Sequence, residues 1–133
     1  MTVTSLSHED CVRLVAAPDR GRVGLLSVDG NRPVPLVCFV QTDGDVLIPT
    51  GEDRTLLRAA AGRPVTVEFT HPDPDGDSSW TIVAIGLAKP LNRRDEPAGF
   101  PYTSGALAML EAFRNGLRVR VARLEGHPAG AGR

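Results

Sequence analysis

Short apolar runs alternate with turn-forming residues along most of the chain, a pattern typical of a sheet of short strands. The predicted strands are residues 22–28, 33–41, 45–49, 64–70, 80–87 and 117–124. Asp29-Gly30 and Asp43-Gly44 separate the first three and favour tight turns. Three strands in meander order predict an antiparallel sheet.

Two short helices are predicted beside the strands. The first begins at Ser7, which can cap it together with Asp10 three residues later, and it ends before Pro18. The second covers residues 56–61, and an apolar stripe over residues 107–113 indicates a third helical segment. Six short strands with little helix favour a mainly β fold, a closed or nearly closed barrel that leaves few exposed edges. The spacing alone also fits a β-sandwich.

Length and charge narrow the class of protein. The 133 residues suit one domain, which we place at residues 1–127 and follow with a flexible tail over residues 128–133. Fifteen basic and sixteen acidic side chains give a formal charge of -1, so the basic surface expected for nucleic-acid binding is absent. The apolar runs are too short to cross a bilayer, and residues 1–10 lack the apolar stretch of a signal peptide. We therefore expect a cytoplasmic protein without a membrane or nucleic-acid partner.

The cysteines and histidines do not indicate a metal site or a thiol nucleophile. Cys38 lies in an apolar run and is interpreted as a small buried hydrophobe, and the local sequence supplies no base that would activate Cys11 or Cys38. The three histidines are scattered without ligand spacing, so no metal is expected. The sequence contains no recognisable catalytic constellation, and the catalytic residues are left unassigned.

The segment from Thr50 to Thr55 is the first candidate for ligand chemistry. It is a polar turn between a predicted strand and a predicted helix, where free backbone N–H groups favour anions. The hydroxyls of Thr50 and Thr55 and the guanidinium of Arg54 would suit a phosphate monoester. The alternative is purely structural: Thr55 caps the helix and Arg54 is solvated.

Two further segments contain candidate residues. Arg32-Pro33-Val34-Pro35 opens a strand in which the prolines cannot donate hydrogen bonds, so neighbouring backbone groups are left for a flat ligand. The alternative is an edge strand with an exposed Arg32. Trp80, the single tryptophan, either packs in a core or an interface or stacks near a planar ring.

The order and spacing of six segments resemble the pyridoxamine 5'-phosphate oxidase-like family of FMN-binding split barrels. The segments are residues 21–25, 32–37, 46–51, 65–69, 80–88, and 119–121 running on to 125–127. The resemblance implies a six-stranded antiparallel split barrel that forms a homodimer, with FMN bound between the two copies. It also implies a flavin-dependent oxidoreductase acting on an unidentified small molecule.

The resemblance assigns cofactor-binding roles by position. Thr50, Arg54 and Thr55 would hold the FMN phosphate. Arg32, Pro33, Val34, Pro35 and Val37 would follow the ring and the ribityl chain, and Trp80 and Thr81 would approach the edge of the ring. Relatives often have Arg or Tyr where Pro49 stands here, and two cations where this turn has one. The alternatives for the cofactor are therefore a deazaflavin or none. The alternatives for the function are a non-catalytic protein that binds or stores a flavin, deazaflavin or haem, and an accessory barrel without a cofactor.

Overall fold

The computed structural model describes residues 6–17, 20–51, 54–72, 79–91 and 115–128, and every structural statement below concerns these residues. All six predicted strands and the first two predicted helices are present. In chain order the elements are α1 (His8–Val15), β1 (Arg22–Val28), β2 (Val34–Val40), β3 (Val46–Pro49), α2 (Thr55–Ala60), β4 (Pro64–Pro72), β5 (Ser79–Pro90) and β6 (Gly116–Pro128). The predicted helical stripe over residues 107–113 lies outside the described residues.

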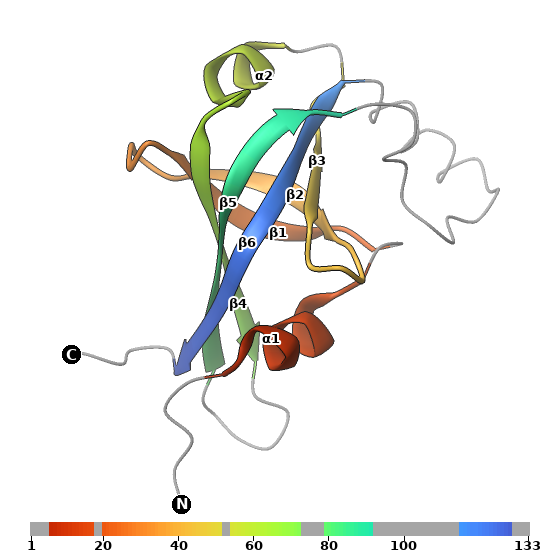
Figure 1. Cartoon of the computed structure of the whole chain (residues 1–133), viewed down its shortest axis with the longest axis vertical. Coiled ribbons are helices and arrows are strands. Elements are labelled where there is room, and N and C mark those ends of the chain that lie inside the picture. The colour runs from red at the N-terminus through yellow and green to blue at the C-terminus, as the bar shows by residue number, and fades with distance from the viewer. Residues whose placement is uncertain (1–5, 18–19, 52–53, 73–78, 92–114, 129–133) are drawn as a thin grey trace, which may run out of the picture.

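The strands close into one barrel in the order β1-β2-β3-β6-β5-β4, and every neighbouring pair is antiparallel. Figure 1 shows the long β5–β6 ribbon crossing the β1–β2 hairpin, with α1 and α2 at opposite ends of the molecule. The predicted barrel is confirmed, and the sandwich alternative is wrong because β1 pairs with β4 and completes the ring.

Helix α1 begins where the sequence predicts. The side chain of Ser7 accepts a hydrogen bond of 3.2 Å from the backbone N–H of Asp10, the N-cap geometry of a helix start. The backbone N–H of Leu6 donates to the carbonyl of Gly126, and Nδ1 of His8 accepts from the backbone N–H of Leu124. These contacts fix α1 against the end of β6, so the helix covers one end of the barrel.

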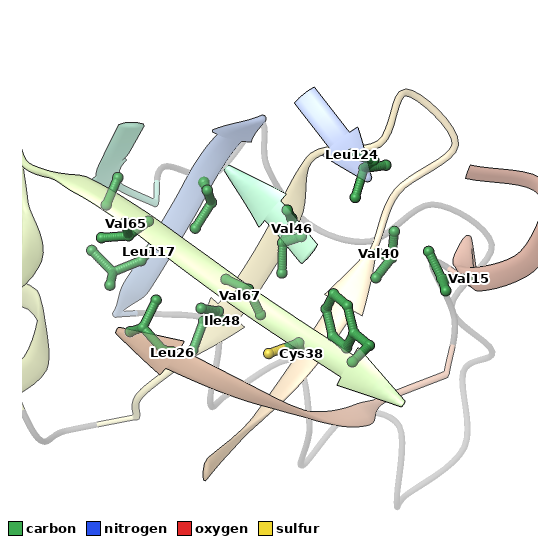
Figure 2. Close-up of a cluster of buried hydrophobic side chains, with 14 of the residues drawn as sticks. Val15, Leu26, Cys38, Val40, Val46, Ile48, Val65, Val67, Leu117 and Leu124 are labelled. Carbon is green, nitrogen blue, oxygen red and sulfur yellow. The ribbon is translucent and has the colours of Figure 1, made fainter. Parts of the chain in front are cut away.

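The inward-facing residues of the strands form the main core, which Figure 2 shows in close-up. Cys38 lies fully buried among them, as the sequence predicts, and burial raises the pKa of its thiol to about 12. A thiol with so high a pKa is neutral and inert at physiological pH. A second, smaller cluster lies on the outer side of β2 and β3, where Phe39 and Leu47 are buried with Leu91 packed against them.

A buried carboxylate connects the β2–β3 turn to β6. The side chain of Asp45 is 9% exposed and pairs with Arg118 at 2.8 Å and with Arg120 at 3.3 Å. Its second oxygen accepts a hydrogen bond of 3.0 Å from the backbone N–H of Val121. Asp43 also pairs with Arg118, at 3.0 Å. This network was not predicted from the sequence, where Asp43 indicated a turn and Asp45 the start of a strand.

The last described strand reaches into the predicted tail. β6 continues to Pro128, the first residue of the predicted tail, and pairs there with Trp80; the rest of that tail lies outside the described residues. No helix in the described part of the chain is both long and apolar enough to cross a membrane.

Candidate functional site

The barrel opens between β2 and β3. These strands pair only at Phe39–Leu47 and Val40–Val46, although the same register would place Val37 opposite Pro49. Pro49 has no N–H to donate, so the ladder cannot continue through it. From residue 34 to residue 38 the backbone of β2 therefore has, among the described strands, a partner only on its β1 side. Unpaired backbone groups at such an edge are available to a ligand.

Thr50 lies at the end of β3, on the other side of this opening. Its backbone N–H donates to the carbonyl of Asn115 at 3.1 Å, and the side-chain amide of Asn115 donates to the carbonyl of Gly51 at 2.6 Å. The backbone of the turn is thus fixed, but Oγ1 of Thr50 is buried without a hydrogen-bond partner. A buried hydroxyl left unpaired costs about 1–3 kcal/mol, and such a group indicates a missing partner.

The next described residues of the turn are Arg54 and Thr55. Arg54 occupies the N-cap position of α2 without capping it through its side chain, and Thr55 is the first helical residue. The alternative in which Thr55 caps the helix is therefore wrong. The side chain of Arg54 is exposed and makes no hydrogen bond or ion pair with the described residues. Because α2 is only six residues long, a phosphate here would depend on Thr50 and Arg54 more than on the helix.

The predicted ring-binding segment forms the exposed start of β2. Arg32, Pro33 and Pro35 are exposed, and the side chains of Val34 and Val37 are 46% and 47% exposed. Pro35 pairs with Leu25 of β1 at a position where β2 has no partner on its other side, so its missing N–H breaks no ladder. This stretch of β2 is thus an edge in the described sheet, with an exposed Arg32 before it, as the structural alternative predicted. Its unpaired side faces the opening.

Trp80 and Thr81 lie at the other end of the barrel. Trp80 pairs with His71 and Pro128 and packs partly buried against the main core, whereas Pro49, next to Thr50, pairs with Gly116. The two ends of β6 lie 12 residues apart, a path of about 40 Å at about 3.3 Å per residue. One chain therefore does not bring Trp80 and Thr81 together with Thr50 and Arg54.

Solved structures share this architecture along nearly the whole chain. An FAD-binding protein from Mycobacterium smegmatis is 23% identical, with 95% of this chain and 98% of that chain covered at a TM-score of 0.62. An FAD-binding protein from Mesorhizobium loti is 19% identical, with 97% and 99% covered at a TM-score of 0.63. A candidate pyridoxamine 5'-phosphate oxidase from Corynebacterium glutamicum is 18% identical, with 96% and 95% covered at a TM-score of 0.62.

The fold is a split barrel. The predicted resemblance to the pyridoxamine 5'-phosphate oxidase-like barrels is thereby confirmed at the level of the fold. No protein-family model matches the sequence, and no curated protein matches it either.

A cavity at the α1 end of the split barrel contains residues that the sequence analysis did not assign. It has a volume of about 460 Å³ and is lined by the last turn of α1, the start of β1 and the end of β4. Arg22 and His71 contribute its polar groups. Arg22 lies in phase with the buried Leu26 of β1, and His71 with the buried Phe69 of β4. A charge at an inward-facing strand position was the sequence signal that could have revealed this cavity.

The thiol of Cys11 is buried, like that of Cys38. Burial, followed by the charges of Asp10 and Glu125, raises the pKa of the Cys11 thiol. The part of the chain that the structure describes holds no cluster of three or more His, Cys, Asp or Glu side chains arranged for a metal ion. The described residues therefore offer binding groups in the opening and in the cavity.

Proposed function

We propose that this chain binds a flavin, with FMN as the expected species, in the opening between β2 and β3. The observation that carries the proposal is the edge of β2 that has no described partner strand, together with the buried hydroxyl of Thr50 at the end of β3, which has no hydrogen-bond partner among the described residues. Two of the three structural neighbours described above are FAD-binding proteins by name, which supports a flavin as the ligand.

The residues present fit a phosphorylated flat ligand. The hydroxyl of Thr50 and the guanidinium of Arg54 would contact the phosphate, beside Thr55 at the start of α2. The unpaired backbone of Val34 to Val37 would donate and accept hydrogen bonds at the polar edge of the ring, and the exposed side chain of Val37 would cover part of it. A bound flavin supplies the capacity for electron or hydride transfer, while the protein binds and orients it.

We further propose that a second copy of the chain completes the site. Val23 pairs with Val37 and Leu25 with Pro35 on the outer face of β1 and β2, where Val23 is 65% and Leu25 38% exposed. An apolar patch of this kind, beside the opening, suits an isologous contact between two copies. In such a dimer the Trp80 and Thr81 end of one copy could reach the opening of the other.

The expected activity is that of a cytoplasmic flavin-dependent oxidoreductase acting on a small molecule. Reduction of the bound flavin by a nicotinamide cofactor, followed by reoxidation by a substrate, would support an enzyme. Stable flavin binding without such turnover would support a storage or sensing protein. A colourless protein that takes up neither FMN, FAD nor a deazaflavin would instead support an accessory role without a cofactor.

The phosphate contact is tested by titrating FMN and riboflavin into Arg54→Ala and following flavin fluorescence. A charge-assisted hydrogen bond is worth about 1.5–3 kcal/mol, so FMN should bind about tenfold or more weakly, while riboflavin, which lacks the phosphate, should be unaffected. Arg58→Ala, one helical turn further along α2 and also exposed, is the matched control. Equal FMN affinity in the two variants would mean that the phosphate lies elsewhere.

Thr50→Val should change two properties in opposite directions: it should raise the stability of the cofactor-free protein and lower its affinity for FMN. The change removes a buried hydroxyl that has no partner, so the cofactor-free protein should become more stable by about 1 kcal/mol. The same change should weaken FMN binding, because the hydroxyl is then missing from the site. Urea unfolding without FMN and fluorescence titration with it measure the two effects. A loss of both stability and affinity would indicate a purely structural role for Thr50.

The dimer is tested with Val23→Lys, which places a charge on the apolar patch without entering the core. Sedimentation should show a monomer, and FMN binding should be lost, while circular dichroism stays unchanged. Glu9→Lys, on the exposed surface of α1, serves as the control and should leave both properties intact. A dimer that persists in Val23→Lys would exclude this patch as the interface.

A further inference from the structure

Arg22 is a half-buried cation whose side chain enters the α1 end of the barrel. One guanidinium nitrogen donates to the carbonyl of Val15 in the last turn of α1, and another faces Nδ1 of His71, both at 3.4 Å. The guanidinium carbon lies 5.6 Å from the centroid of the Phe69 ring, within the range of a cation–π contact. These neighbours hold the group in place from the protein side.

Within the described part of the chain, no acidic side chain neutralises this charge. No carboxylate of the described residues pairs with Arg22, and the two polar contacts are long for a group with five N–H donors. Burial lowers the pKa of Arg22. Burial and the charge of Arg22 in turn lower the pKa of His71. His71 is therefore neutral near pH 7, and its Nδ1 is an acceptor for Arg22.

The cavity beside this guanidinium has room for a small molecule. Its volume of about 460 Å³ falls within the range of about 300–1,000 Å³ that small-molecule pockets occupy. Apolar side chains of Leu14, Ala16 and Ala17 line one part of it, and Arg20 adds a second cation at its border. The cavity thus combines an apolar wall with a planar, uncompensated cation.

We propose that this cavity binds a small organic acid, with its carboxylate on Arg22 and its apolar body against the end of α1. The planar guanidinium fork matches a carboxylate in shape and charge. A single inward-facing cation beside a neutral histidine suits a monoanion better than a phosphate dianion. The proposal does not depend on flavin binding, because the residues that line the cavity, from α1, β1, β4 and the segment before β1, include none of those proposed to hold the flavin.

Benzoate is a suitable probe, with benzamide as a neutral molecule of the same shape. We expect saturable binding of benzoate to the unmodified protein, about tenfold or more tighter than that of benzamide, as a charge-assisted pair requires. Two-dimensional NMR should locate the change at the side-chain N–H of Arg22, at His71 and at the methyl groups of Leu14. Equal binding of the two probes, no saturation at millimolar benzoate, or shifts centred on Thr50 would overturn the proposal.

Two variants separate charge from shape. Arg22→Gln should reduce benzoate affinity about tenfold or more towards that of benzamide, and Arg22→Lys, which keeps the charge but not the fork, should fall in between. Arg58→Gln, an exposed cation on α2, should bind benzoate like the unmodified protein. If Arg22→Gln unfolds, the comparison of the two probes on the unmodified protein and on Arg22→Lys still decides the question. Unchanged benzoate affinity in Arg22→Lys, together with equal binding of benzamide, would exclude a carboxylate contact.

Discussion

Replacing Asp45 with alanine removes the carboxylate on which the β2–β3 turn and β6 converge. The lost contacts are the ion pairs to Arg118 and Arg120 and the hydrogen bond from the N–H of Val121. Asp45 and Arg118 are 9% and 18% exposed at their side chains, so water can replace little of what is removed. The variant therefore leaves a mostly buried guanidinium and a backbone N–H without their principal acceptor.

The size of the effect follows from this burial. Removing one partner of a buried ion pair costs about 3–5 kcal/mol, because the remaining charge stays buried without compensation. Asp43 still pairs with Arg118 at 3.0 Å, which keeps the expected loss near the lower limit, at about 3 kcal/mol. That loss is a large fraction of the roughly 5–15 kcal/mol by which a domain of this size is stable.

Urea unfolding followed by circular dichroism, at one fixed protein concentration, measures the loss. Asp43→Asn is the matched control: it removes a carboxylate that is 57% exposed but keeps an oxygen for the backbone N–H of Asp45, and it should cost less than about 1 kcal/mol. Adding Arg118→Met to Asp45→Ala should recover part of the loss, since the uncompensated charge is then gone. If Asp45→Ala costs no more than Asp43→Asn, the buried network does not stabilise the fold.

Three further changes test other parts of the structure. Because the pKa of Cys38 is raised from 9.0 to about 12, its neutral form stabilises the fold fully below pH 9, and up to about 4 kcal/mol is lost as the pH rises towards 12. In urea unfolding across this range Cys38→Val should show a shallower alkaline decline, and parallel declines would contradict the assignment. Gly86→Ala should cost about 3 kcal/mol of stability, because the added Cβ would collide with the carbonyl of Arg120 at a β-bulge. Gly30→Ala, where Gly30 has a positive φ and open space around it, should cost about 1 kcal/mol. Equal urea midpoints for the two variants would refute this difference. Ser7→Ala removes the cap of α1 and should lower stability by about 1 kcal/mol in the same assay, and an unchanged midpoint would show that the cap is dispensable.

The strands were predictable because period-two patterns and Asp-Gly turns act locally. The turns at Asp29-Gly30 and Asp43-Gly44 separate β1, β2 and β3 as predicted. The extension of β5 to Pro90 and of β6 to Pro128 was not predictable, because it depends on pairing between two distant segments whose ends are rich in proline and glycine. Barrel closure through β1 and β4 is likewise a long-range property that no local pattern specifies.

The candidate site was predictable in its parts but not in its arrangement. The polar turn at Thr50 and the proline-containing start of β2 were identified from residue type, and the structure places them on either side of the opening. Local sequence does not reveal that Trp80 lies at the far end of β6 from Thr50. That separation follows from strand order and strand length, and it is the reason the proposed flavin site includes a second copy.

Two arginines of the barrel differ in how the chain compensates their charge, and the difference bears on function. Arg118, on β6, has two carboxylates within 3.0 Å, as the cost of burying an ion requires. Arg22, also partly removed from water, has a carbonyl and a neutral imidazole at 3.4 Å and no carboxylate among the described residues. Since aspartates neutralise Arg118, the same fold could have placed a carboxylate beside Arg22, but the described residues include none there. The uncompensated charge opens onto a cavity of about 460 Å³, so the missing anion is best explained as a molecule that enters from solution.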